Sequence, residues 1–172
     1  MQKFVLIALI LVIQAYAGFG QEKIIAASNE FKIEGKVKTE LTYTLKDLSA
    51  FPSQLIKDVE IINHKGELKG SAKGLKGIVL KTIFDKVEFL TDSPKELSEF
   101  YFIFIATDGY KVVFSWNELF NTEVGNTVFL ITEKDGKKIN EMEERILVIS
   151  TSDLKVGRRY IKGLSKIIVS KV

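Results

Sequence analysis

The stretch FYFIFIATDGYKVVFSWNELF, residues 100–120, contains two apolar segments on either side of an Asp-Gly pair. Phe100 to Ala106 form seven consecutive apolar positions rich in aromatic and β-branched side chains, which is typical of a strand in the middle of a sheet. Asp108-Gly109 tolerates the positive φ angles of a tight turn, and extended apolar sequence resumes over residues 110–116. The stretch therefore predicts an antiparallel hairpin.

A short helix is expected directly after this hairpin, beginning near Trp116. Ser115 and Glu118 have the spacing at which a hydroxyl caps a helix and a carboxylate three residues later reaches back to the cap. Leu119 and Phe120 supply the apolar face of the helix.

The first 17 residues have the organisation of a secretory signal peptide. Lys3 precedes the apolar run Phe4 to Ile13, and Ala15-Tyr16-Ala17 is a small-x-small cleavage pattern. This apolar run is about half of the ~20 residues that a membrane-spanning helix needs, which argues against a transmembrane anchor. We therefore expect a secreted or periplasmic protein that is not an integral membrane protein after cleavage near Gly18. Residues 18–30 are interpreted as a flexible lead-in, and residues 31–172 as one domain.

The chain contains no cysteine, so disulfides, thiolate nucleophiles and thiolate metal ligands are all excluded. The 46% apolar and 27% charged residues are typical of a globular protein whose stability comes from a packed core. The net charge of +3 is too small to indicate a polyanionic partner.

Strands and short helices alternate through residues 31–172, which predicts an α+β fold. Further strands are expected at 31–37, 59–62, 127–132, 146–150 and 167–169, and helices at 45–51 and 78–86. The first strand alternates apolar and charged residues and is interpreted as an edge strand with one exposed face. A second tight turn is expected at Asp135-Gly136.

Residues 66–77, GELKGSAKGLKG, combine regularly spaced glycines with lysines and are interpreted as a mobile cationic loop. A phosphate-binding loop is the alternative, but the GxxxxGK[ST] signature is absent. The C-terminal segment 152–172 carries six cations and no acidic residue after Asp153. We interpret it as a solvated basic face, and secretion argues against nucleic acid as its partner.

Five segments of the chain resemble the molybdopterin-binding domain of the sulfite oxidase family. They are FKIEGKV at 31–37, LKDL to Pro52 at 45–52, GIVLKTIF at 77–84, ATDGY at 106–110 and GRRYIKGLSKI at 157–167. Their order and spacing, rather than any single motif, are similar to the family pattern. The resemblance implies a sulfite-oxidase-like fold of mixed β-sheets with a few short helices.

The chain departs from that family at the metal ligand. In the family, a cysteine after the strand matching residues 59–62 binds molybdenum, and here the sequence reads Ile-Ile-Asn63-His64. Neither side chain supplies the soft sulfur that this chemistry uses. His64 is the only histidine, and a metal site usually needs several convergent donors. The sequence therefore predicts no metal site and no catalytic residue.

Basic residues of the closing segment hold the pterin phosphate in the family. The resemblance thus implies Arg159 and Lys162, and less directly Arg158, as anion contacts, with Asn63 and His64 beside them. Our first hypothesis is a non-enzymatic domain that keeps the fold and binds an anionic small molecule or a protein partner there. The alternative is an oxidoreductase, or a subunit of one, that carries molybdopterin without a protein thiolate.

Overall fold

The computed structural model describes residues 25–172, so the predicted signal peptide 1–17 and most of the lead-in 18–30 lie outside the described part. The described end of the lead-in is packed: Ser28 is buried, and its N–H donates to the carbonyl of Glu144 at 3.5 Å. In residues 25–172, no helix is both long enough and apolar enough to cross a membrane.

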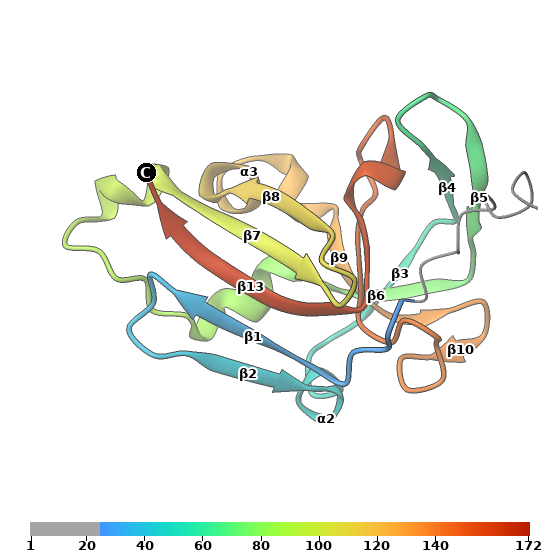
Figure 1. The fold of residues 1–172 in the computed structure, drawn as a ribbon, viewed down its shortest axis with the longest axis horizontal. Helices are drawn as coiled ribbons and strands as arrows, with labels where there is room; N and C mark the ends of the chain where they lie inside the picture. The colour runs from blue at the N-terminus through green and yellow to red at the C-terminus, as the bar shows by residue number, and fades with distance from the viewer. Residues whose placement is uncertain (1–24) are drawn as a thin grey trace, which may run out of the picture.

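Two sheets form the body of the molecule (Figure 1). The five-stranded sheet has the order β2-β1-β13-β7-β8, from β2 (Leu41–Thr44), β1 (Glu30–Gly35), β13 (Leu164–Lys171), β7 (Phe100–Ala106) and β8 (Lys111–Ser115). The pair β1–β13 is parallel, and the other pairs of this sheet are antiparallel.

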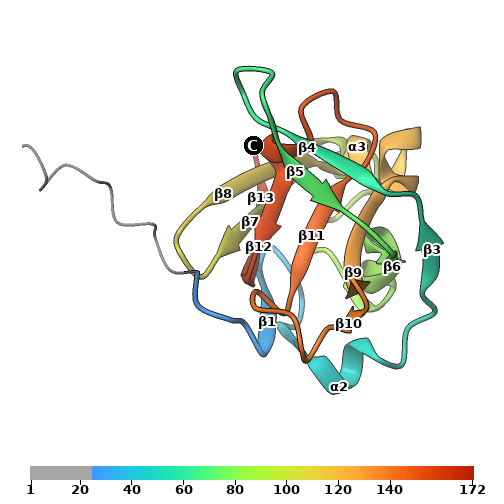
Figure 2. The ribbon, with the colours of Figure 1, turned by 90° about the vertical axis from the view of Figure 1, so that its right-hand side faces the viewer.

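The second sheet follows the order β12-β11-β9-β6-β3, with β10 paired to β9. Its strands are β12 (Tyr160–Lys162), β11 (Leu147–Ser150), β9 (Val128–Lys134), β6 (Leu75–Val79), β3 (Gln54–Ile56) and β10 (Lys137–Lys138). A separate hairpin of β4 (Val59–Ile62) and β5 (Leu68–Ala72) lies over one face of this sheet (Figure 2).

Helical structure is confined to short segments. The α-helices of the described chain are α2 (Leu45–Leu48) and α3 (Trp116–Phe120), and 3-10 helices span Leu80–Lys86, Pro94–Glu99, Glu123–Asn126 and Val156–Arg159. The mixed α+β class, mostly sheet with a few short helices, is therefore confirmed.

The central hairpin is confirmed in detail. β7 and β8 pair antiparallel with Phe104 opposite Val112, and the chain turns between them at Gly109, whose φ is +83°. Ser115 caps α3 by accepting from the Glu118 N–H at 3.1 Å, while the Glu118 carboxylate accepts from the Ser115 N–H at 3.1 Å. Both predictions succeeded because each depends on interactions within a few residues.

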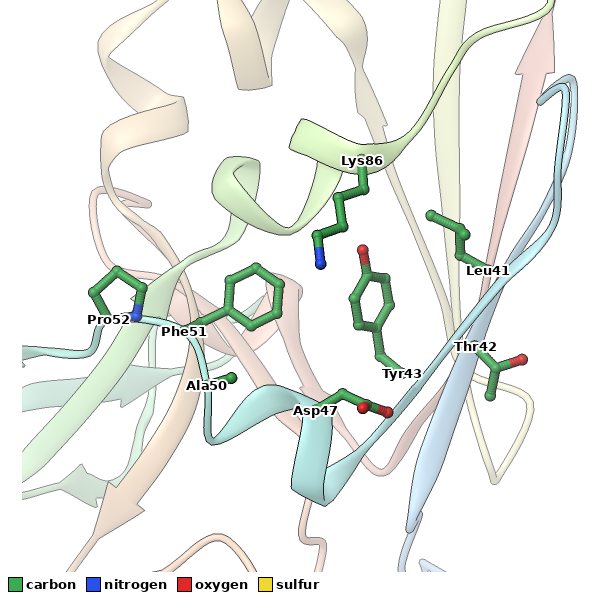
Figure 3. A pocket seen from close by; sticks show the side chains of 8 residues that line it. All are labelled: Leu41, Thr42, Tyr43, Asp47, Ala50, Phe51, Pro52 and Lys86. Carbon is green, nitrogen blue, oxygen red and sulfur yellow. The ribbon is translucent and has the colours of Figure 1, made fainter.

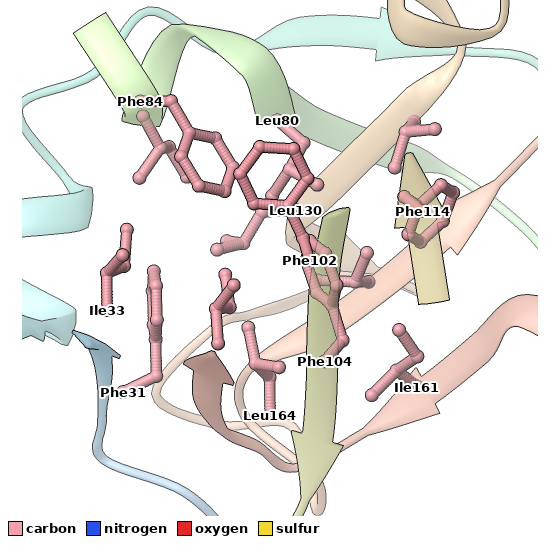
Figure 4. Packing of buried hydrophobic residues seen from close by; sticks show 14 of the residues in the cluster. Phe31, Ile33, Leu80, Phe84, Phe102, Phe104, Phe114, Leu130, Ile161 and Leu164 are labelled. Atoms are coloured by element: carbon pink, nitrogen blue, oxygen red, sulfur yellow. The ribbon is translucent and has the colours of Figure 1, made fainter. Parts of the chain in front are cut away.

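The main core lies between the two sheets (Figure 4). Alternate side chains of β7 point into it, and Phe102 and Phe104 are fully buried against Leu130 of β9 and Ile161 of β12, all in one cluster. The ring centroids of Phe84 and Phe102 lie 4.9 Å apart. Burying a side chain of this size contributes about 1.5–3 kcal/mol, so these residues dominate the stability of the sheet pair.

A second apolar cluster occupies the other face of the six-stranded sheet. Leu75, Phe129 and Ile149 belong to it, and the β4–β5 hairpin covers it through Val59 and Ala72. Both faces of β11 and of the first four residues of β9 are thus buried, which explains the apolar runs at residues 128–131 and 147–149.

Three predictions about secondary structure were wrong. The strand over 31–37 is not an edge strand, because β1 lies between β2 and β13. Residues 66–77 are not a loop, because β5 and the start of β6 lie there. The expected helix 78–86 begins only at Leu80 and is a 3-10 helix, because Ile78 still belongs to β6 and pairs with Leu130.

Gly77 shows why a glycine-rich sequence forms a strand at this point. A Cβ at Gly77 would lie 2.9 Å from the Leu130 carbonyl oxygen and 2.8 Å from the Ile56 Cδ1 atom. The glycine therefore permits close packing within the sheet, rather than a mobile loop.

The other local predictions are confirmed, except that the helix expected at 45–51 ends at Leu48. The turn at Asp135-Gly136 joins β9 to β10 with φ angles of +52° and +75°. The strands expected at 59–62, 127–132, 146–150 and 167–169 correspond to β4, β9, β11 and β13, and Thr44 caps α2 as a second capping box.

Candidate functional site

The two segments singled out by the sequence, around residues 61–64 and 157–163, are in direct backbone contact. A Cβ on Gly157 would lie 2.7 Å from the Ile62 carbonyl oxygen and 3.5 Å from the Asn63 Cα atom. The Lys155 ammonium also donates to the carbonyl oxygen of His64 at 2.8 Å. The backbones therefore meet at Gly157 with no room for even a methyl group.

Arg159, the main candidate for binding a phosphate, is held by two carboxylates. Its Nε and Nη2 atoms donate to Asp153 at 2.6 and 2.5 Å, and its Nη1 atom donates to Glu118 at 2.8 Å. The guanidinium carbon lies 4.5 Å from the centre of the Phe114 ring. The Asp153 carboxylate, with help from Glu118, raises the pKa of Arg159 above its usual value. The guanidinium is thus already paired within the protein.

Lys162 and Arg158 differ from Arg159 because both are exposed, and neither takes part in an ion pair among residues 25–172. The Lys162 ammonium lies 5.7 Å from the centre of the Tyr160 ring. The carbonyl oxygen of Arg158 accepts a hydrogen bond from the Tyr110 hydroxyl at 2.6 Å. This bond ties the Asp-Gly-Tyr turn of the central hairpin to the closing segment.

A pocket of about 250 Å³ lies at this junction. Its wall includes Asp108 and Tyr110 from the hairpin turn, and Gly157, Tyr160 and Lys162 from the closing segment. Burial raises the pKa of Tyr160, so its phenol stays neutral at physiological pH. The pocket therefore offers one ammonium group, one carboxylate and two tyrosines.

Asn63 and His64 do not face this pocket, and their hydrogen bonds are those of a turn. The Asn63 Oδ1 atom accepts from the N–H groups of Lys65 and Glu67 at 2.9 and 3.0 Å, and its Nδ2 atom donates to the Glu67 carboxylate at 2.8 Å. His64 is exposed in the same turn between β4 and β5. Within the described chain, no group of three or more His, Cys, Asp or Glu side chains is arranged to hold a metal.

The expected solvated basic face at residues 152–172 forms only in part. Besides Arg159, Lys166 pairs with Glu34 at 2.8 Å, and Lys171 pairs with Glu96 at 2.6 Å. Acidic residues thus pair with half of the six cations in this segment, whereas Lys155, Arg158 and Lys162 are exposed and make no ion pair in the described chain.

Two comparisons with known proteins found nothing: no family model matches the chain, and no curated protein matches its sequence. Solved structures do match. The sulfane dehydrogenase SoxCD from Paracoccus pantotrophus aligns with a TM-score of 0.61 and 14% sequence identity. The match covers 85% of this chain and 40% of that chain, so this chain spans less than half of the dehydrogenase chain. At this identity, the likeness shows the fold alone.

The residues present do not fit a molybdenum-pterin group held in the way that the family resemblance implies. No thiolate ligand is available, because the chain has no cysteine, and Asn63 uses its side chain within its own turn. Arg159 commits three of its five N–H donors to Asp153 and Glu118, so a phosphate would have to share the guanidinium with two carboxylates.

Larger hollows elsewhere in the described chain were not foreseen from the sequence. The first, about 570 Å³, lies on the other side of the Gly157 contact, and its rim includes Leu55 and Leu154, which are 79% and 94% exposed. The second, about 510 Å³, is shown in Figure 3. There the Lys86 side chain points between the rings of Phe51 and Tyr43, and the Tyr43 hydroxyl donates to the Ile83 carbonyl at 3.0 Å.

These hollows have no signal in the sequence because their walls come from separate segments. The pocket of Figure 3 combines residues 41–52 with Lys86 of the 3-10 helix. The other hollow combines residues 55–62 with residues of the segments 127–129 and 151–156.

Proposed function

We propose that this chain is a secreted or periplasmic, non-enzymatic binding domain built on a sulfite-oxidase-like fold. Its ligand is a small anion, which binds in the pocket beside Lys162. The observation that carries this proposal is a difference in ion pairing. Arg159 is paired with carboxylates, whereas Lys162 lines a pocket and has no ion pair in the described chain.

The size of the pocket limits the ligand. Small-molecule sites usually enclose about 300–1,000 Å³, and this pocket of about 250 Å³ lies just below that range. Asp108 also lines the pocket, and its carboxylate accepts from the Tyr110 N–H at 2.8 Å. A compact anion such as inorganic phosphate or a short carboxylate can accept from the Lys162 ammonium while avoiding that carboxylate.

The lack of a thiol or an imidazole in the pocket supports a binding role. The chain has no cysteine, and its single histidine lies outside the pocket in the β4–β5 turn. The pocket side chains that can exchange a proton are Asp108, Tyr110, Tyr160 and Lys162, and burial keeps the Tyr160 phenol protonated. We therefore favour a site that holds an anion over one that activates a nucleophile.

Isothermal titration calorimetry with inorganic phosphate, sulfate and acetate tests the proposal. We expect Lys162→Gln to weaken binding about fivefold, the upper end for an ion pair open to solvent, and added salt to weaken it further. Lys32→Gln, on an exposed position of β1, is the matched control and should leave binding unchanged. Equal affinity in the Lys162→Gln protein, or no binding of any of these anions at millimolar concentration, would overturn the proposal.

The second candidate is a molybdopterin-dependent oxidoreductase, or a subunit of one, without a protein thiolate. The fold likeness to a sulfane dehydrogenase supports it. Metal analysis of protein purified from its native host separates the two candidates. Stoichiometric molybdenum would establish the second and refute the first, and its absence would eliminate the second.

A further inference from the structure

A pocket of about 560 Å³ lies between α2 and the strands β6, β9 and β10, away from Lys162 and the hairpin turn. One wall is formed by α2 and the chain that follows it, residues 45–53. The opposite wall is formed by Lys76 of β6, the end of β9 and residues 138–140. Its volume is well inside the range of small-molecule sites.

The floor of this pocket is apolar and continuous with the core. Leu48 is 1% exposed and belongs to the main cluster, while Leu45, Phe51 and Ile139 pack against that cluster as partly buried residues. Ile139 also packs against the second cluster. An apolar group that entered the pocket would therefore be placed against side chains already held by the core.

The rim of the pocket is cationic. Three lysines and one glutamate line it, a formal charge of 3 − 1 = +2. Lys76, Glu133 and Lys138 occupy matching positions on the adjacent strands β6, β9 and β10. The Glu133 carboxylate pairs with Lys76 at 2.8 Å.

The other two ammonium groups, those of Lys46 and Lys138, lie outside this ion pair. The charge of Lys46 acts on a carboxylate by helping the hydrogen bonds from Thr44 to lower the pKa of Asp47. Among residues 25–172, neither Lys46 nor Lys138 makes an ion pair or a side-chain hydrogen bond. The nearest carboxylates in sequence are engaged elsewhere: Asp47 accepts from the N–H of Thr44, and Glu141 accepts from the backbone N–H of Lys138. These two cations stand on opposite walls of the pocket.

We propose that this pocket binds a free amphiphilic anion, a molecule with one carboxylate, sulfate or phosphate group on an apolar body. The apolar body lies on the floor formed by Leu48, Phe51 and Ile139, and the charged group lies between Lys46 and Lys138. An apolar floor with a few convergent charged groups is the usual design of a small-molecule site. This site is independent of the pocket beside Lys162.

Calorimetry with three eight-carbon probes tests the charge requirement. Octanoate should bind, whereas octanol and octylammonium, which share its apolar chain, should bind at least tenfold more weakly. Lys46→Gln and Lys138→Gln should each weaken octanoate about fivefold. Lys137→Gln is the matched control, because Lys137 is the exposed neighbour on β10 and does not line the pocket. Octanoate binding that is equal in all variants, or octylammonium binding as tight as octanoate binding, would overturn the proposal.

Chemical shift mapping in solution tests the location. Octanoate should shift the amide signals of residues 45–53 and 132–140 and leave the Asp108-Gly109-Tyr110 turn unchanged. Shifts confined to other regions would refute the assignment. Binding to phosphatidylglycerol vesicles without any octanoate binding would place the anionic group in a membrane and refute a free ligand. Lys162→Gln should leave octanoate affinity unchanged, so failure here and failure of the phosphate site are distinguishable.

Discussion

Replacing Arg159 with alanine separates a structural arginine from one that is available to a ligand. The change removes two hydrogen bonds to Asp153, one to Glu118 and the stacking on Phe114. The Arg159 and Asp153 side chains, which form the ion pair with two hydrogen bonds, are well shielded from solvent, with exposures of 20% and 13%. Removing the arginine therefore leaves a largely buried carboxylate without its counter-charge.

The magnitude follows from these exposures. A hydrogen bond between shielded charged groups contributes about 1.5–3 kcal/mol, and the two bonds to Asp153 share one ion pair and do not add. The Glu118 side chain is 37% exposed, so its pairing contributes only about 0–1 kcal/mol. The Phe114 contact adds about 0.5–1 kcal/mol. The Ser150 hydroxyl, which donates to Asp153 at 2.7 Å, offsets part of the loss. We expect Arg159→Ala to lower the free energy of unfolding by about 2–4 kcal/mol.

Urea denaturation followed by circular dichroism measures this loss, and a loss of about 3 kcal/mol corresponds to a decrease in Tm of roughly 6–12 °C for a domain of this size. Arg158→Ala is the matched control: its side chain is exposed, and the carbonyl that binds Tyr110 is retained, so a change within about 0.5 kcal/mol is expected. A double-mutant cycle with Asp153→Asn should give a coupling of at least about 1 kcal/mol. If Arg159→Ala is as stable as Arg158→Ala, the reasoning is refuted, and Arg159 is free to bind an anion.

Three further perturbations test other parts of the structure. Gly157→Ala should lower stability by about 1–3 kcal/mol in thermal unfolding, because its Cβ would lie 2.7 Å from the Ile62 carbonyl oxygen; unchanged stability would show that the two segments are not in contact. Ser115→Ala should cost about 1 kcal/mol through loss of the α3 cap, and a loss below about 0.3 kcal/mol would contradict the capping box. Burial raises the pKa of Tyr160, so its phenol should ionise above the usual pH of about 10 in a spectrophotometric titration. Because the unfolded state ionises first, stability is fully present below pH 10 and should fall above it, and Tyr160→Phe should reduce that decline; an equal decline in both proteins would count against a buried phenol.

Predictions from the sequence were accurate where the determining interactions are local. The turn of the hairpin 100–115, the α3 cap and the Asp135-Gly136 turn each depend on backbone angles and hydrogen bonds within a few residues, and the tight turn brings the strands β7 and β8 together. The apolar composition of β7 indicated its position inside a sheet, although every second side chain of the strand is only partly buried. These features could be read without knowledge of the rest of the fold.

The glycine-rich segment 66–77 was misjudged for the opposite reason. Glycine and lysine content favours a loop, but β6 is a strand because β9, more than 50 residues later, pairs with it and buries Ile78 and Leu75. The edge position assigned to β1 failed in the same way, since its partner β13 is the last strand of the chain. Strand pairing over such distances leaves no mark on the local composition.

The candidate site also combines features that the sequence indicated with partners that only the fold brings together. A run of cations at the C-terminus was evident from the sequence, but its partners were not: Glu118 lies 41 positions from Arg159, and Glu34 lies 132 positions from Lys166. The pocket between α2 and β10 draws its walls from three separate segments. None of these segments is distinctive by itself.

The amino-acid sequence by itself determined the central hairpin, the capped helices, the tight turns and the lack of any thiolate ligand, because these depend on neighbouring residues or on composition. Only the tertiary structure decided which cations are paired, that the backbone at Gly157 packs directly against Ile62 and Asn63, and where cavities remain. The physical reason is that ion pairing and burial depend on distance in space, and the fold brings together carboxylates, lysines and apolar walls that are far apart along the chain.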